Sequence, residues 1–170
     1  ARLRTGAHGQ VDLGALPVQT RTLVVDAYGR LSVSPAAVLS VLERANGSAN
    51  GTVRVGGVLQ LGTPGVHDSV VPFAMRIDEG GLLQVARRLI IGAGAHAVVR
   101  GQVDGLEELY VGFQPSTAPG SGLPLADRIG GTSTFAGRSS VFEAVGPYLI
   151  RGLGGSESRG LEVVQVGEHA

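Results

Sequence analysis

The sequence predicts an all-β fold, a single antiparallel β-sandwich with jelly-roll topology favoured and one short helix near residues 35–45. Three observations predict it. Apolar residues make up 43% of the chain, which is enough for a packed core. They occur in short segments separated by glycine, 28 residues of 170, a pattern typical of many short strands. Asp104-Gly105 joins two such segments, 95–103 and 106–113, and Asp-Gly is a strong hairpin signal.

The length of 170 residues suits one domain, 1–170, with one core. No shift of composition divides the chain, and no internal repeat is evident. Residues 1–20 are irregular in pattern, and we expect an extended arm or an edge strand there.

The one predicted helix follows the strands expected at 21–28 and 31–33. Ser34 is a suitable cap, Pro35 suits the first turn, and Val38, Leu39 and Leu42 form an apolar stripe. Further strands are expected at residues 52–61, 132–145, 148–151 and 161–166. Two Gly-rich segments, 114–126 and 152–160, are expected as long loops.

The middle of the chain contains one clear strand and one ambiguous segment. In 69–77 the residues Val71, Phe73, Met75 and Ile77 repeat with period two, and Pro72 within it indicates an edge strand. Residues 82–91 fit both a helical face and a hairpin partner of that strand. The short Gly-rich turn before them favours the strand.

Composition excludes several functions. The 14 basic residues are all Arg and balance 14 acidic residues, so we expect no nucleic-acid partner and no membrane contact. Without Lys, neither a P-loop nor a Schiff-base enzyme is possible. Without Cys, no thiolate metal site forms. Charged residues are only 16%, so the surface is either covered by neighbours or made polar by Ser, Thr, Gln and Gly.

The motif Gly92–Ala97 matches a dinucleotide fingerprint, but a following helix would soon meet Asp104-Gly105. We expect a Gly/Ala turn between strands and no cofactor. The four histidines, His8, His67, His96 and His169, lack the short spacing of a metal site. We therefore expect no metal ligand.

Catalytic patterns are equally weak. His67-Asp68-Ser69 contains the residue types of a triad, but a triad is a spatial arrangement and adjacency does not indicate one. The acidic pairs Asp78-Glu79 and Glu107-Glu108 are expected in solvated turns rather than across a cleft. We predict that the protein is not an enzyme, has no catalytic residue and has no small-molecule substrate.

The chain resembles bacteriophage structural proteins in four features. It has many short strands separated by glycine, a polar loop at 114–126, no Lys and no catalytic cluster. The most similar type is a small single jelly-roll capsid protein of a tailless phage from a thermophilic, GC-rich host. The resemblance implies a coat protein in the virion that associates with copies of itself, with or without a second coat protein. Low charge and the open sheet edges of a sandwich predict an interface made by strand edges and by the arm at 1–16. The alternative is a soluble binding module, a fibre head or a receptor- or carbohydrate-binding domain, that recognises its ligand through long loops.

Overall fold

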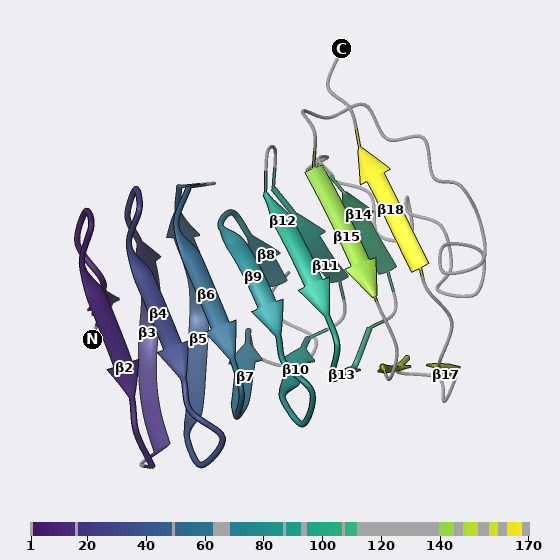
Figure 1. Ribbon diagram of the computed structural model, residues 1–170, viewed down its shortest axis with the longest axis horizontal. Coiled ribbons are helices and arrows are strands. Elements are labelled where there is room, and N and C mark those ends of the chain that lie inside the picture. Colours follow the sequence, from purple (N-terminus) through teal and green to yellow (C-terminus); the bar gives the residue numbers. More distant parts are fainter. Residues whose placement is uncertain are drawn as a thin grey trace.

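The computed structural model is a β-solenoid, in which successive turns of the chain lie side by side along one long axis (Figure 1). It describes residues 2–15, 17–48, 50–62, 69–86, 88–92, 95–106, 108–111, 140–144, 148–152, 157–159 and 163–167. All described regular elements are strands.

Three sheets form the walls of the solenoid. The first sheet contains, in order, β1 (Arg2–Arg4), β3 (Pro17–Val25), β5 (Val38–Gly47), β7 (Val58–Leu61), β10 (Leu82–Val85), β13 (Gln102–Asp104), β16 (Leu149–Arg151) and β17 (Glu157–Arg159). The second contains β2 (Gln10–Leu13), β4 (Arg30–Val33), β6 (Thr52–Val55), β9 (Ala74–Ile77), β12 (His96–Val99), β15 (Ser140–Ala144) and β18 (Val163–Gly167). The third contains β8 (Ser69–Val71), β11 (Arg88–Ile91) and β14 (Glu108–Val111).

The strand register shows a repeat that the sequence analysis missed. Leu3 pairs with Leu23, and Val58 pairs with Leu82, so that one turn takes 20 to 24 residues between β1 and β13. The ladders from β1 to β16 are parallel. Only β17 and β18, which pair with β16 and β15, run antiparallel.

The core forms columns of equivalent residues, because parallel strands in register place the inward positions of successive turns in contact. In β6, Val53 and Val55 are fully buried, whereas Thr52 and Arg54 are exposed. One column crosses the second sheet and is at most 2% exposed throughout; it comprises Leu31, Val53, Met75, Ala97 and Phe142.

Glycines occupy one corner of three successive turns, at Gly57, Gly81 and Gly101, where the backbones of these turns are close. The amide of Leu82 donates to the carbonyl of Gly57, and that of Gln102 donates to the carbonyl of Gly81. A Cβ atom on Gly101 would lie 2.4 Å from the carbonyl oxygens of both Asp78 and Gly81. This corner therefore requires glycine for lack of space.

The predicted antiparallel β-sandwich with jelly-roll topology is wrong, and so is the helix near residues 35–45. That segment contains β5, in which Leu39 and Val41 are buried at alternate positions. Ser34 closes a tight turn instead of capping a helix, because its carbonyl accepts a hydrogen bond from the amide of Ala37 at 2.9 Å. Pairing of β5 with both β3 and β7 outweighs the helical pattern.

The hairpin predicted at Asp104-Gly105 is also wrong. β13 pairs with β10 and β16, both in parallel, and β14 pairs with β11 in another sheet. Gly105, with φ +82°, forms a corner, and a Cβ atom there would lie 2.4 Å from the carbonyl oxygen of Val85. The residue pair is a turn signal, but the turn leads into the next wall instead of reversing the chain.

Residues 82–91 are strands, as favoured, but they form β10 and β11 in two different sheets. Residues 69–77 likewise form β8 and β9. The chain bends at Pro72, after β8, which is an edge strand of the third sheet. Val71, Phe73, Met75 and Ile77 all face the core as predicted.

The segment 1–20, expected as an arm, contains β1, β2 and the start of β3. The loop predicted at 114–126 lies outside the described residues, as do the ends of the chain. The loop predicted at 152–160 is described only at 152 and in β17.

Candidate functional site

The turns that follow β2, β4, β6, β9 and β12 of the second sheet form one long edge of the solenoid, at the bottom of Figure 1. A groove of about 690 Å³ lies along this edge. Its polar side chains are those of Ser32, Ser34, Arg54, Arg76, Asp78, Glu79 and Arg100. We call it the arginine groove.

The solenoid register brings the three arginines together. Arg54 and Arg76 are paired positions of β6 and β9 and both face outward, and neighbouring strands are about 4.8 Å apart. Arg100 follows β12 in the next turn, and its amide donates to the carbonyl of Ile77 at 2.8 Å. Three cations from three turns thus line one groove.

Asp78 lies between two of these guanidinium groups. Nε of Arg54 donates to Oδ2 of Asp78 at 2.6 Å, and Nε of Arg76 donates to Oδ1 at 3.1 Å. Like charges opposite each other on a sheet repel, and the shared carboxylate offsets this repulsion. The hydrogen bond that Arg54 donates to Asp78, together with the negative charge of Asp78, raises the pKa of Arg54 above its ordinary value.

The arginines retain unused donors. A guanidinium has five N–H groups, and the bonds to Asp78 involve only Nε of Arg54 and of Arg76. Within the described part of the chain, the side chain of Arg100 takes part in no hydrogen bond or ion pair. Three arginines face Asp78 and Glu79, so the groove carries one positive charge in excess. A carboxylate, sulfate or phosphate group matches such donors.

The sequence motifs considered for catalysis have structural explanations where they are described. Gly92 follows β11 and is followed by the strand β12, so the helix of a dinucleotide site is missing. Residues 93 and 94 lie outside the described part. Ser69 is buried; its hydroxyl donates to the carbonyl of Leu61 at 3.0 Å and accepts from the amide of Ala86. His67 and Asp68, the other two residues of this sequence motif, lie outside the described residues.

Of the two acidic pairs, the structure describes Asp78-Glu79. Asp78 and Glu79 both line the arginine groove, but Asp78 is bonded to two arginines whereas Glu79 is exposed in the turn. Glu107 and the side chain of Glu108 lie outside the described part of the structure. The expectation of a solvated turn therefore holds for Glu79 but misses the role of Asp78 as the partner of two arginines.

The described histidines have other neighbours. Nε2 of His96 lies 3.2 Å from Oε2 of Glu143 on the adjacent turn, and the ring of His8 stacks on that of Tyr28. No group of three or more potential metal ligands occurs among the residues that the structure describes. His67 and His169 lie outside them.

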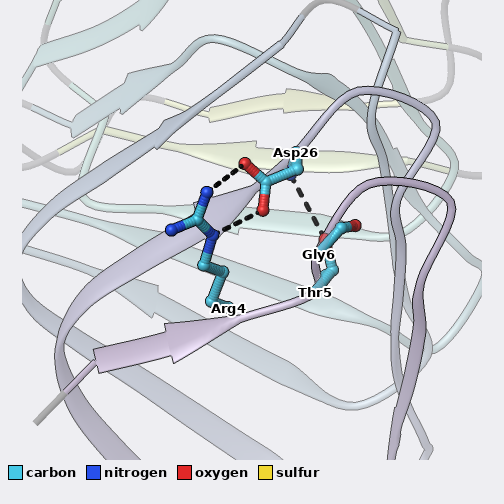
Figure 2. A network of polar contacts seen from close by, with 4 residues as sticks. All are labelled: Arg4, Thr5, Gly6 and Asp26. Carbon is cyan, nitrogen blue, oxygen red and sulfur yellow. Dashed lines mark hydrogen bonds and ion pairs between the residues drawn. The ribbon is translucent and has the colours of Figure 1, made fainter.

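A second polar network ties the first two turns together at the opposite edge of the second sheet (Figure 2). Nε and Nη2 of Arg4 donate to the two carboxylate oxygens of Asp26 at 2.7 and 3.1 Å. Thr5 Oγ1 accepts from the amide of Asp26 and donates to the carbonyl of Gly6. The hydrogen bond from Arg4 is the main cause that lowers the pKa of Asp26. Both carboxylate oxygens of Asp26 accept from Arg4, and this link between two turns fits a structural role.

Local sequence patterns do not indicate the arginine groove, because its three arginines are far apart in the sequence. Arg54, Arg76 and Arg100 are spaced by about one solenoid turn. A search for residue types that recur every 20 to 24 positions would have found them, and would have indicated the repeat itself.

No protein-family model, no curated protein and no solved structure matches this chain. In the described segments, no helix has the length and apolar character needed to cross a membrane.

Proposed function

We propose that this chain is a non-catalytic binding protein, a rigid solenoid that holds an anionic group in the arginine groove. The observation that carries the proposal is the unpaired guanidinium of Arg100, beside two arginines that share one carboxylate. This proposal replaces the jelly-roll coat protein and keeps the prediction that the protein is not an enzyme. The binding surface is a solenoid edge instead of the loops of a sandwich.

Charge and rigidity support the proposal. The bidentate geometry of Arg side chains suits carboxylate and phosphate oxygens, and strands on both sides fix the backbone of β9, the central strand of the groove. The groove has only one positive charge in excess, which favours a ligand with isolated anionic groups over a densely charged nucleic acid.

The test compares the wild type with Arg100→Gln, using sodium sulfate and sodium glucuronate as probes at constant ionic strength. Arg44→Gln is the matched control, because Arg44 is an exposed arginine on β5 outside the groove. Ligand that binds only the folded state raises the melting temperature. We expect a rise for the wild type and for Arg44→Gln, and a smaller one for Arg100→Gln. An equal rise in all three proteins, or none in any, contradicts the proposal.

A second candidate function is self-association through the first turn of the solenoid, and a specific observation favours it. Leu3, Val11 and Leu13 pack against the core but remain half-buried, whereas their partners one turn later, Leu23 and Leu31 among them, are buried. One edge of β1 and of β2 has no strand partner among the described residues. Such an edge pairs readily with another chain, and we propose a second copy.

Light scattering tests this association. A charge on the exposed edge opposes strand pairing, so Val11→Arg should lower the mass of the assembly. Thr52→Arg, which changes an outward residue of the same sheet inside the solenoid, should leave the mass unchanged. A wild type that stays monomeric at high concentration excludes self-association and leaves the anion-binding proposal unaffected.

A further inference from the structure

Two aromatic rings occupy equivalent positions in the first two turns, on the solenoid edge opposite the arginine groove. The amide of Arg30 donates to the carbonyl of Gly9, and the amide of Thr52 donates to the carbonyl of Gly29. This places the preceding residues, His8, Tyr28 and Asn50, at matching corners of three successive turns. The first two positions carry rings and the third carries a short amide.

The two rings stack with their centroids 5.1 Å apart and their planes inclined by 14°. His8 thus covers one face of the Tyr28 ring. Tyr28 is still 57% exposed, and it is the one large hydrophobic residue so exposed in the described part of the chain. The face of the ring that is turned away from His8 is therefore open to solvent.

The backbone at both positions is left-handed, which is unfavourable for the tyrosine. His8 has φ 57° and Tyr28 has φ 58°, the left-handed region that residues with bulky side chains rarely adopt. Asn and Gly adopt it readily, and either would suit the turn better. Strain of this kind is often retained where a side chain has a function, so an exposed tyrosine here indicates more than turn formation.

The surroundings of the open face are polar, and the exposed Arg30 lies two residues from Tyr28. The amide of Asn50 is held by the hydroxyl of Ser48 at 3.2 Å, while the side chain of Asn50 makes no hydrogen bond within the described residues. The nearby cation Arg4 is paired with Asp26. A ligand at this corner thus meets an aromatic face and the free side-chain amide of Asn50, with guanidinium groups nearby.

We propose that Tyr28 and Asn50 bind a neutral sugar ring, a site separate from the arginine groove and independent of the function proposed for it. The CH face of a pyranose packs on the open face of Tyr28, and ring hydroxyls exchange hydrogen bonds with the Asn50 side chain. His8 holds the Tyr28 ring from behind and positions it.

The alternative is that the two rings only stabilise the turns by stacking. Tyr28→Asn separates the two explanations, because Asn tolerates the left-handed backbone but offers no ring. A binding role predicts an unchanged or higher melting temperature together with loss of sugar binding. If the stack only stabilises the turns, Tyr28→Asn should have a lower melting temperature than the wild type. That result, together with an absence of sugar binding by the wild type, overturns the proposal.

The binding experiment uses the full chain with cellotriose as the probe and adenosine as the comparison, monitored through the NMR signals of the tyrosine rings. The chain has three tyrosines, and the buried Tyr148 serves as an internal control. We expect cellotriose to shift the Tyr28 ring signals and leave those of Tyr148 in place. The Tyr28→Phe variant, whose ring remains, should still bind. Asn50→Ala should bind about threefold to tenfold more weakly, as expected for the loss of a hydrogen bond.

Three results overturn the proposal. The first is an absence of ring shifts with cellotriose in the wild type, and the second is a shift with adenosine alone, which would indicate a base-stacking surface. The third is unchanged cellotriose binding by Tyr28→Asn, because the site would then lie elsewhere. Since the arginine groove is tested with anions and Arg100→Gln, failure of one proposal leaves the other intact.

Discussion

Replacing Gly101 by alanine tests the stacking of solenoid turns directly. Its Cβ atom would lie 2.4 Å from the carbonyl oxygens of Asp78 and Gly81, both in the preceding turn. Each distance is well below ordinary contact, and both obstacles are backbone atoms that cannot rotate away. The turns must therefore separate locally, which stretches the hydrogen bond from the amide of Gln102 to the carbonyl of Gly81, now 2.9 Å.

The expected change in the free energy of unfolding of Gly101→Ala follows from two opposing effects. Overpacking a tight site costs about 1–3 kcal/mol, whereas Gly→Ala stabilises by about 0.4–1 kcal/mol through the lower entropy of the unfolded chain. We expect a net loss of about 1–2 kcal/mol in the free energy of unfolding. Gly14→Ala is the control, because its Cβ atom would meet nothing within 4 Å and its φ is not in the left-handed region.

The assay is urea unfolding followed by circular dichroism at one temperature, with the three proteins at equal concentration. Gly101→Ala should unfold at lower urea than the wild type, and Gly14→Ala at equal or higher urea. The opposite signs are decisive, since the two changes are chemically identical. If Gly101→Ala is as stable as Gly14→Ala, the turns do not approach each other at this corner and the stacking argument is refuted.

Two further predictions concern the core and the first two turns. Leu59 is fully buried in β7, so Leu59→Ala should lower the free energy of unfolding by about 2–5 kcal/mol in urea melts, and a loss below about 1 kcal/mol would contradict its position in the core. The pKa of Asp26 lies below its ordinary value of 3.8, so its stabilising contribution is complete above that pH and is lost as the pH falls through the lowered pKa. Urea midpoints of the wild type and Asp26→Asn should therefore differ at pH 7 and converge at low pH; a constant difference would exclude the ion pair with Arg4 as its cause.

The arginine groove shows why local patterns did not reveal the site. Arg54 and Arg76 lie 22 positions apart, and no rule based on neighbouring residues connects them. They lie side by side because β6 and β9 pair in a register that places Arg54 opposite Arg76. His8 and Tyr28 were equally separate in the sequence, although each precedes a glycine in a turn of similar composition.

The sequence by itself determined that the chain is built of short strands separated by glycine turns, and which residues face the core, as with Val71, Phe73, Met75 and Ile77. Alternation of apolar residues is a local property, so a strand and its buried face can be predicted without its partner. The tertiary structure decided the partners. Gly57, Gly81, Gly101 and Gly105 signal turns in the sequence, but whether a turn reverses the chain or leads it into the next wall depends on contacts with residues a full turn away. The direction of the chain after each turn distinguishes a β-solenoid from an antiparallel sandwich. In the solenoid, successive turns bring the three arginines to one edge.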